Sequence, residues 1–255
     1  MTRIVVVACV AGMLMACQSS GPAPTPARDQ PFDVLITNGR VVDGTGAPWY
    51  RADVGITGDR ITAIGNLANR EAKTRIDAAN LVVAPGFIDM LGQSEFNVLV
   101  DPRAASKITQ GITTEITGEH QSIAPLNEAM AKAEQPAYDR RKIALDFRTI
   151  GEYFARLQRT PPTINLGTFV GAGGVRNYVI GQTERPATAA EMEAMKKLVD
   201  QAMRDGALGV STSLQYVPGR FASTEEIVEL AKVARQYGGI YITPQRSESG
   251  QIIPS

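Results

Sequence analysis

Residues 81–90 read LVVAPGFIDM and separate two different sequence patterns. Before this stretch, residues 32–77 form short alternating runs broken by turn residues such as Asn38-Gly39. Such runs are typical of β-strands in a small sheet, and an Asn-Gly pair between two of them predicts a hairpin. After it, apolar runs alternate with helical patterns. The sequence therefore predicts an all-β portion followed by an α/β portion.

The α/β portion alternates strand and helix patterns. The predicted strands lie at residues 82–88, 113–116, 164–170, 208–214 and 239–243. The helical patterns lie at residues 101–110, 128–158, 188–205 and 223–237. This alternation predicts a parallel sheet, either doubly wound or closed as a barrel. Gly171-Ala172-Gly173-Gly174 lacks the spacing and the acidic partner of a dinucleotide site, so a tight strand-to-helix turn is the better interpretation.

The composition excludes several classes of protein. The 255 residues carry 26 basic and 26 acidic side chains, so no excess of positive charge points to a nucleic-acid partner. Hydrophobic residues at 44% and charged residues at 20% are ordinary values for a globular chain. Two cysteines are too few for a disulfide scaffold or a cysteine-rich zinc site. The single histidine, His120, excludes any mechanism that needs several imidazoles.

The first 31 residues predict an export signal and a tether. Residues 4–14 are an apolar run too short to span a bilayer, as in a signal peptide. The run ends in Leu14-Met15-Ala16-Cys17, which resembles the lipobox of bacterial lipoproteins. We therefore expect residues 1–16 to be removed and Cys17 to be acylated, with the proline-rich residues 17–31 as a semi-rigid tether. A plain signal peptide or a buried apolar helix is the alternative.

This lipid anchor would also decide where the protein resides. Gln18 follows the cysteine, and this residue resembles the sorting pattern of the outer membrane in Gram-negative bacteria. We expect an exported lipoprotein whose acyl chains bind the lipid membrane at the periplasmic face of the outer membrane.

Several separated motifs resemble those of one enzyme family, and they occur in the family's order. They are Asn38-Gly39-Arg40-Val41-Val42-Asp43-Gly44, Val83-Ala84-Pro85-Gly86-Phe87-Ile88-Asp89, Gln110-Gly111-Ile112-Thr113-Thr114, Gly206-Ala207-Leu208-Gly209-Val210-Ser211-Thr212 and Arg246-Ser247-Glu248. Between about residues 32 and 248 the chain resembles the N-acyl-D-amino-acid deacylase (D-aminoacylase) branch of the amidohydrolase superfamily. The resemblance implies a metal-dependent (β/α)8 barrel of the TIM type, a small β-sandwich, and hydrolysis of linear amides, which are non-peptide carbon–nitrogen bonds.

The resemblance also implies a domain organisation. Residues 32–85 correspond to a portion of the β-sandwich and residues 86–255 to the barrel. A full barrel takes about 250 residues, whereas residues 86–255 hold about five of the eight strand–helix units. We therefore expect a partial TIM-type barrel preceded by a β-sandwich half, which corresponds to the N-terminal portion of a family member.

Family members activate water with metal ligands at the ends of barrel strands. After the first strand the family places a His-x-His pair, where this chain has Leu91-Gly92-Gln93. After the second strand the family has a cysteine ligand, where this chain has Gly118-Glu119-His120-Gln121. A later family histidine falls at Pro244 or Gln245. The resemblance leaves Glu119 and His120 as candidate ligands of a divalent metal, expected to be zinc, although both are equally open to a bystander role in a loop.

Five further polar residues are candidates for the barrel mouth: Asp89, Gln93, Glu95, Arg246 and Glu248. The first three lie where the histidine pair would be, and could bind a metal or a polar ligand weakly. The last two either pair with each other or line the mouth.

Three hypotheses for the function remain open. The first is metal-dependent hydrolysis of an N-acyl-D-amino acid or a related small amide. The second is a truncated or degenerate, non-catalytic lipoprotein of the same family, which the missing ligand positions favour. The third is a doubly wound periplasmic binding protein, although the β-rich segment before Pro85 argues against it.

Overall fold

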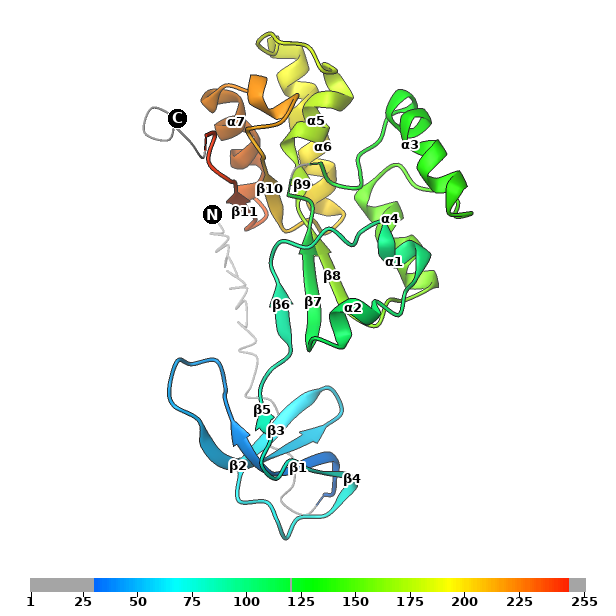
Figure 1. Ribbon diagram of the computed structural model, residues 1–255. Coiled ribbons are helices and arrows are strands. Elements are labelled where there is room, and N and C mark those ends of the chain that lie inside the picture. The colour runs from blue at the N-terminus through cyan, green and yellow to red at the C-terminus, as the bar shows by residue number, and fades with distance from the viewer. Residues whose placement is uncertain (1–29, 120, 248–255) are drawn as a thin grey trace, which may run out of the picture. The chain divides into compact units, whose positions relative to one another are not determined.

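The computed structural model describes residues 30–119 and 121–247, and these fall into two compact units that meet in sequence at Pro85 and Gly86 (Figure 1). The predicted signal peptide, the lipidation site Cys17 and most of the predicted tether lie outside the described residues. The candidate site residues His120 and Glu248 also lie outside them. Each unit is described by itself below.

The first unit is a five-stranded sheet. Its strands are β1 (Phe32–Val41), β2 (Tyr50–Thr57), β3 (Arg60–Gly65), β4 (Ala72–Asp77) and the short β5 (Val82–Val83). The order is β3-β2-β1-β4, and β5 also pairs with β1. β2 runs antiparallel to both β1 and β3, whereas β4 and β5 run parallel to β1. Leu35, Thr37, Gly39 and Val41 alternate as the buried positions of β1, as expected for a half-buried strand.

The predicted hairpin at Asn38-Gly39 is wrong. β1 continues through these residues, and its pairing with β2 shifts there as a bulge. Asn38 adopts a φ of 64°, its backbone N–H donates to Asp53 Oδ1 at 2.9 Å, and its side-chain amide donates to Asp77 Oδ1 at 2.8 Å. Carboxylates from both neighbouring strands therefore hold the left-handed residue within a continuous strand, which a local turn signal cannot reveal.

The second unit alternates parallel strands with helices, which confirms the predicted α/β class. β6 (Phe87–Asp89), β7 (Ile112–Thr117) and β8 (Asn165–Thr168) form one parallel sheet in that order. β9 (Val170–Gly171), β10 (Gly209–Ser211) and β11 (Ile240–Ile242) form a second, with β10 in the middle. The strands predicted at residues 82–88 and 164–170 are each divided in two.

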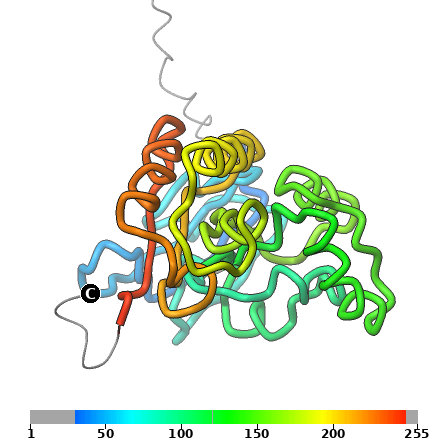
Figure 2. Tube along the Cα trace, turned by 90° about the horizontal axis from the view of Figure 1, so that it is seen from above, coloured from blue at the N-terminus to red at the C-terminus, as the bar shows by residue number. Residues whose placement is uncertain are grey.

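The helices of the second unit also depart from the predicted bounds. They are α1 (Asn97–Val100), α2 (Ala105–Ile108), α3 (Glu128–Arg140), α4 (Ile150–Arg159), α5 (Ala172–Val179), α6 (Ala189–Arg204) and α7 (Thr224–Arg235), with a 3-10 turn at Gly219–Phe221. The pattern at residues 128–158 gives two helices, because Lys142 takes a φ of 56° just after α3. α6 and α7 pack side by side (Figure 2). Within the described ranges, no helix combines the length and apolarity that a membrane span requires.

Two apolar clusters make the core of the second unit. The larger one joins β9 and β10 to α5, α6 and α7, and its members include Val170, Val210, Met195, Val199 and Leu230. The second is aromatic, with Phe96 stacked edge-on against Tyr138 at 4.8 Å between ring centroids, and Phe147 against Tyr153 at 5.3 Å. This aromatic cluster supports one wall of the cavity described next.

Candidate functional site

The loops that follow β6 and β7, together with α3, line a cavity of 680 Å³ in the second unit. Gln93 and Glu95 enter from the loop after β6, and Glu119 and Gln121 from the loop after β7. Because β6 and β7 are parallel neighbours, their carboxyl ends bring these two loops together. A volume of this size suits a small organic molecule.

One face of α3 forms the opposite wall. The lining side chains are Met130, Ala133, Glu134, Ala137 and Tyr138, and Arg141 follows at the helix end. Their spacing of three and four residues places them on one side of the helix. Ala133 and Ala137 are small, so the middle of this wall leaves room for a ligand. The wall is therefore mostly apolar or small, with a carboxylate at Glu134 in its middle and a guanidinium at Arg141 at its end.

The loop after β6 is held down by Glu115 of β7. Glu115 is fully buried, and its Oε1 accepts a hydrogen bond from the Ser94 backbone N–H at 2.9 Å. The Gly92 N–H donates to the carbonyl of Ile116 at 2.8 Å. A Cβ atom on Gly92 would lie 1.9 Å from Glu115 Oε1, so only glycine permits this close approach. These contacts fix the path of the loop that brings Gln93 and Glu95 to the cavity.

Asp89 faces α2 and does not line the cavity. Its Oδ2 accepts from Lys107 Nζ at 2.6 Å, and the same ammonium lies 3.5 Å from Glu115 Oε2. The Lys107 hydrogen bond lowers the pKa of Asp89, and the bond to Asp89 raises the pKa of Lys107. Lys107 therefore compensates two carboxylates, and Asp89 supports the loop because its Oδ1 accepts from the Leu91 N–H at 3.2 Å.

Glu95 lines the cavity, and its carboxyl group has a raised pKa. Its Oε2 is buried and has no hydrogen-bond partner among the described residues. Burial raises the pKa of Glu95, and the nearby Glu115 carboxylate adds to this effect. The Tyr153 hydroxyl donates to the Glu95 backbone carbonyl at 2.8 Å, which fixes the residue's position. A carboxyl group in this state can hold and transfer a proton inside the cavity.

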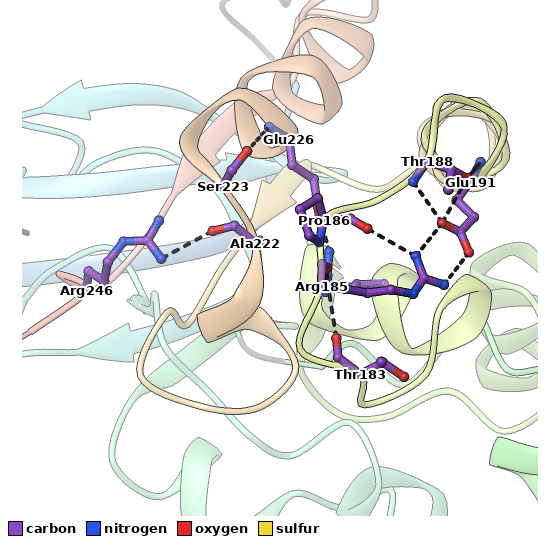
Figure 3. A network of polar contacts seen from close by, with 10 residues as sticks. Thr183, Arg185, Pro186, Thr188, Glu191, Ala222, Ser223, Glu226 and Arg246 are labelled. Atoms are coloured by element: carbon purple, nitrogen blue, oxygen red, sulfur yellow. Dashed lines mark hydrogen bonds and ion pairs between the residues drawn. The ribbon is translucent and has the colours of Figure 1, made fainter.

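Arg246 lies apart from this cavity. Its Nη1 donates to the Ala222 carbonyl at 3.3 Å, next to Ser223, whose hydroxyl caps the start of α7 (Figure 3). Arg246 therefore fastens the chain after β11 to the start of α7. Its expected partner Glu248 lies outside the described residues.

The structure thus assembles some candidates and separates others. Gln93, Glu95 and Glu119 share the cavity lining, whereas Asp89 and Arg246 have other partners. Sequence reasoning missed the α3 wall, including Tyr138 and Arg141, and it missed Asn177 and Gln182 near the end of α5. The spacing of small and apolar residues within 128–141 was the available signal for the α3 wall.

The described donors do not make a metal site by themselves. Within residues 30–119 and 121–247, no three side chains of the His, Cys, Asp and Glu types gather where they could hold one ion. Glu119 is half-buried in the cavity lining. Since protein zinc sites use three or four ligands, Glu119 and Glu95 alone do not fit this metal. A metal here would depend on His120 and on donors outside the described residues.

Comparisons with known proteins give relatives over most of the chain. A family model described as the urease alpha-subunit, N-terminal domain, matches residues 11–88. D-aminoacylase from Alcaligenes xylosoxydans xylosoxydans is 40% identical over 225 residues, which are 88% of this chain and 46% of that protein. The chain therefore spans about half the length of the curated relatives it matches.

Solved structures agree with the sequence relatives. A D-aminoacylase structure, described with a binuclear metal center, matches with a TM-score of 0.79 at 40% identity, over 88% of this chain and 47% of that one. N-acyl-D-glutamate deacylase from Bordetella bronchiseptica, complexed with zinc and a phosphonate inhibitor, matches with a TM-score of 0.77 at 34% identity. That match covers 88% of this chain and 47% of the deacylase.

The structural matches place the chain beside one class of enzyme, because the D-aminoacylase structure that it matches over 88% of its length is described as an amidohydrolase. The cavity lies at the carboxyl ends of parallel strands, as ligand sites in such folds do. Within this class, the resemblance to the N-acyl-D-amino-acid deacylases is confirmed by D-aminoacylase and by N-acyl-D-glutamate deacylase. None of the comparisons gives specific support to the non-catalytic alternative.

Proposed function

We propose that the protein hydrolyses the amide bond of N-acyl-D-amino acids or closely related linear amides. The observation that carries this proposal is the cavity, because its lining loops follow β6 and β7, the strands of two deacylase-like motifs. D-aminoacylase and the two deacylases for acidic substrates, N-acyl-D-aspartate deacylase and N-acyl-D-glutamate deacylase, support the substrate class.

Glu95 is the group proposed to move the proton. In the reaction, water adds to the carbonyl carbon, the carbon–nitrogen bond breaks, and the proton lost by water is transferred to the leaving nitrogen. A group that carries this proton works best when its pKa lies near the working pH. Burial raises the pKa of Glu95 towards that range. Glu95 lines the cavity, and its buried Oε2 has no hydrogen-bond partner among the described residues.

A divalent metal, with zinc as the proposed ion, is the cofactor that the relatives suggest. The Bordetella bronchiseptica deacylase was solved with zinc, and the D-aminoacylase structure is described with a binuclear center. We propose Glu119 and His120 as ligands in this chain. Since the described donors do not complete a site, no step of the reaction is assigned to the metal.

The finer architecture and the cellular location belong to the same proposal. The parallel strands of residues 86–255 would form part of a TIM-type barrel, and residues 32–85 part of a β-sandwich. Residues 1–16 would be a signal peptide, residues 17–31 a tether, and Cys17 the lipid-modified residue at the periplasmic face of the outer membrane. The anchor is tested by replacing Cys17 with serine and measuring the protein in the membrane and soluble fractions. If Cys17 carries the lipid, the variant is expected to move from the membrane fraction to the soluble fraction.

The activity is tested with purified protein, N-acetyl-D-leucine and N-acetyl-L-leucine, with and without added zinc. We expect release of D-leucine and a loss of roughly 100-fold or more in rate for Glu95→Gln, the typical contribution of a positioned acid–base group. Glu193→Gln, on the exposed side of α6, is the matched control. Failure to release the free amino acid from any N-acyl-D-amino acid in the presence of zinc contradicts the proposed activity.

The metal is tested separately by elemental analysis of the purified protein. We expect bound zinc in the wild-type protein and less zinc in His120→Ala and in Glu119→Gln. Equal metal content in all three proteins would rule out these ligands while leaving the hydrolysis test intact.

A further inference from the structure

Arg141 stands at the end of the α3 wall and lines the cavity. It is the one basic side chain among the described residues that line it. Within the described chain, its guanidinium makes neither an ion pair nor a hydrogen bond. This differs from Arg148 nearby, which contacts Glu128 and the carbonyl of Leu145. The hydrogen-bonding capacity of Arg141 is therefore available to a ligand.

An aromatic stack holds this guanidinium in place. Its Cζ lies 4.9 Å from the centre of the Phe96 ring, and Phe96 stacks edge-on against the buried Tyr138. A guanidinium over an aromatic face gains a cation–π attraction while its N–H groups stay free at the edges. The side chain is thus positioned without using the fork of donors that binds a carboxylate in two hydrogen bonds.

Apart from Glu134, the rest of the wall is suited to hydrocarbon. Met130, Ala133 and Ala137 line the stretch of α3 before Arg141, and Ile123 and Leu126 line the loop side. The carboxylates of Glu95 and Glu119 come from the loops after β6 and β7, whereas Arg141 comes from α3. The described lining thus combines small and apolar side chains of α3, interrupted by the carboxylate of Glu134, with one cationic group at Arg141.

We propose that Arg141 binds a carboxylate of the ligand in this cavity, while the apolar face of α3 contacts the ligand's hydrocarbon part. This inference rests on the proposed function, since it takes the ligand to be an N-acyl amino acid. The carboxylate has two chemical sources: the α-carboxylate of the amino acid, or a carboxylate at the far end of a dicarboxylic acyl group. Arg141 is in either case a specificity residue.

Calorimetric titration with three probes distinguishes the two sources. N-hexanoyl-D-leucine carries only the α-carboxylate, N-succinyl-D-leucinamide carries only an acyl carboxylate, and N-hexanoyl-D-leucinamide carries neither. We expect one of the two acids to bind the wild-type protein more tightly than the neutral amide. Arg141→Ala removes that preference, with a roughly tenfold weaker Kd for the preferred acid, and leaves the neutral amide unchanged.

Three further variants test whether the effect on binding belongs to the guanidinium of Arg141. Arg141→Lys keeps the charge but loses the planar fork, so we expect an intermediate affinity. Arg140→Ala removes an exposed α3 arginine that does not line the cavity, and is expected to bind all probes as wild type does. Glu134→Gln removes a negative charge from the same wall, and is expected to keep or strengthen binding of the acid. Melting temperatures of all variants verify that they fold.

The outcomes separate this inference from the proposed activity. Binding of an acid that depends on Arg141, without release of leucine or leucinamide, supports the inference and contradicts the activity. Hydrolysis with a KM for N-hexanoyl-D-leucine and N-succinyl-D-leucinamide that Arg141→Ala leaves unchanged overturns the inference and supports the activity. Failure of the wild-type protein to bind any probe, or equal binding of acids and neutral amide, also overturns the inference.

Discussion

At the scale of single residues, the contact between Gly92 and Glu115 determines where the cavity residues lie. Glu115 is a buried carboxylate in a short parallel strand. Burying a carboxylate costs free energy unless hydrogen-bond or ion-pair partners compensate its charge. The Ser94 N–H and the Lys107 ammonium provide that support. The same Ser94–Glu115 hydrogen bond ties the loop that carries Gln93 and Glu95 to β7. The cavity thus depends on a residue that does not line it.

Adding one methyl group at Gly92 tests this contact. We expect Gly92→Ala to lower the free energy of unfolding by about 1–3 kcal/mol, the usual cost of overpacking a filled site, because the new Cβ would lie 1.9 Å from Glu115 Oε1. Urea unfolding measures the change. Glu115→Ala makes room, so the double variant is expected to lose less than the two single variants together.

Gly174→Ala is the matched control for this variant. A Cβ there would meet only the Gln121 Cα at 4.0 Å, in the interior of α5. Alanine in a helix interior is favoured over glycine by roughly 0.5–1 kcal/mol, so this variant is expected to be as stable as wild type or more so. Equal stability of Gly92→Ala and wild type would show that the loop does not depend on the close approach.

The raised pKa of Glu95 makes a prediction about pH and stability. Because the folded-state pKa exceeds the unfolded one, the folded protein binds more protons between the two values, and its stability falls as pH rises through that window. Glu95→Gln removes this loss. We therefore expect the variant to melt at a higher temperature than wild type at pH 8, with the difference shrinking below about pH 4, the usual range of a free carboxyl group.

Thermal unfolding from pH 4 to pH 8 measures this difference. Glu134→Gln, which removes an exposed carboxylate from the same cavity, is the control. A melting temperature for Glu95→Gln that lies below that of wild type at pH 8 contradicts the assigned burial of Glu95.

At the scale of elements, a buried ion pair fastens α5 to α7. Arg176 and Glu226 are 0% and 5% exposed, and Arg176 Nη1 lies 2.6 Å from Glu226 Oε2. Arg176 also donates to the carbonyls of Thr183 and Arg185 in the loop after α5. The Glu226 N–H bonds to the capping Ser223, next to the carbonyl that accepts Arg246 (Figure 3). Arg176 therefore links the segments that follow β9 and β10, and Arg246 adds the segment that follows β11.

Removing this arginine leaves a buried carboxylate without its cation. We expect Arg176→Met to destabilise the protein by about 3–5 kcal/mol, the usual cost of breaking a buried pair from one side. Arg176→Met combined with Glu226→Leu is expected to recover much of this loss, because no charge then stays buried.

Urea unfolding compares these variants with Arg185→Met. Arg185 pairs with Glu191 at the surface, with 41% of its side chain exposed, so its loss is expected to cost at most about 1 kcal/mol. A cost for Arg176→Met as small as that for Arg185→Met would show that the buried pair does not hold the two helices.

At the scale of the whole molecule, each parallel sheet of the second unit has an open edge within the described residues. β6 and β8 are the outer strands of one sheet, and β9 and β11 of the other. Phe87 and Ile88 of β6 and Ile240 of β11 are each more than half exposed. Exposed apolar strand edges pair readily with other chains.

We therefore expect the purified protein to self-associate as its concentration rises. Sedimentation velocity measures this association, and Ile240→Lys is expected to reduce it by placing a charge on the β11 edge. Val228→Lys, at an exposed apolar position on α7, is the control. A wild-type protein that stays monomeric at all concentrations contradicts this expectation.

Much of the architecture could be predicted from the sequence because its signals are local. The change of pattern at residues 81–90 coincides with the boundary between the compact units, and helix starts at Thr188 and Ser223 lie where the patterns begin. The bulge at Asn38 could not be predicted, because the carboxylates that hold it belong to two other strands. The break after Arg140 had a local signal that the predicted helix over 128–158 overlooked, because Thr149 and Glu152 form a capping box at the start of α4.

The features of the candidate site also separate into those that the sequence predicted and those that only the structure revealed. The sequence by itself determined the deacylase resemblance, the α/β class and the two loops that hold Gln93, Glu95 and Glu119, because motif order and strand position are written along the chain. Only the tertiary structure decided that Asp89 turns to Lys107, that Arg141 borders the cavity, and that Glu95 is buried enough to shift its pKa. Burial, ion pairing and desolvation depend on which distant segments pack together, and a linear pattern does not contain that information.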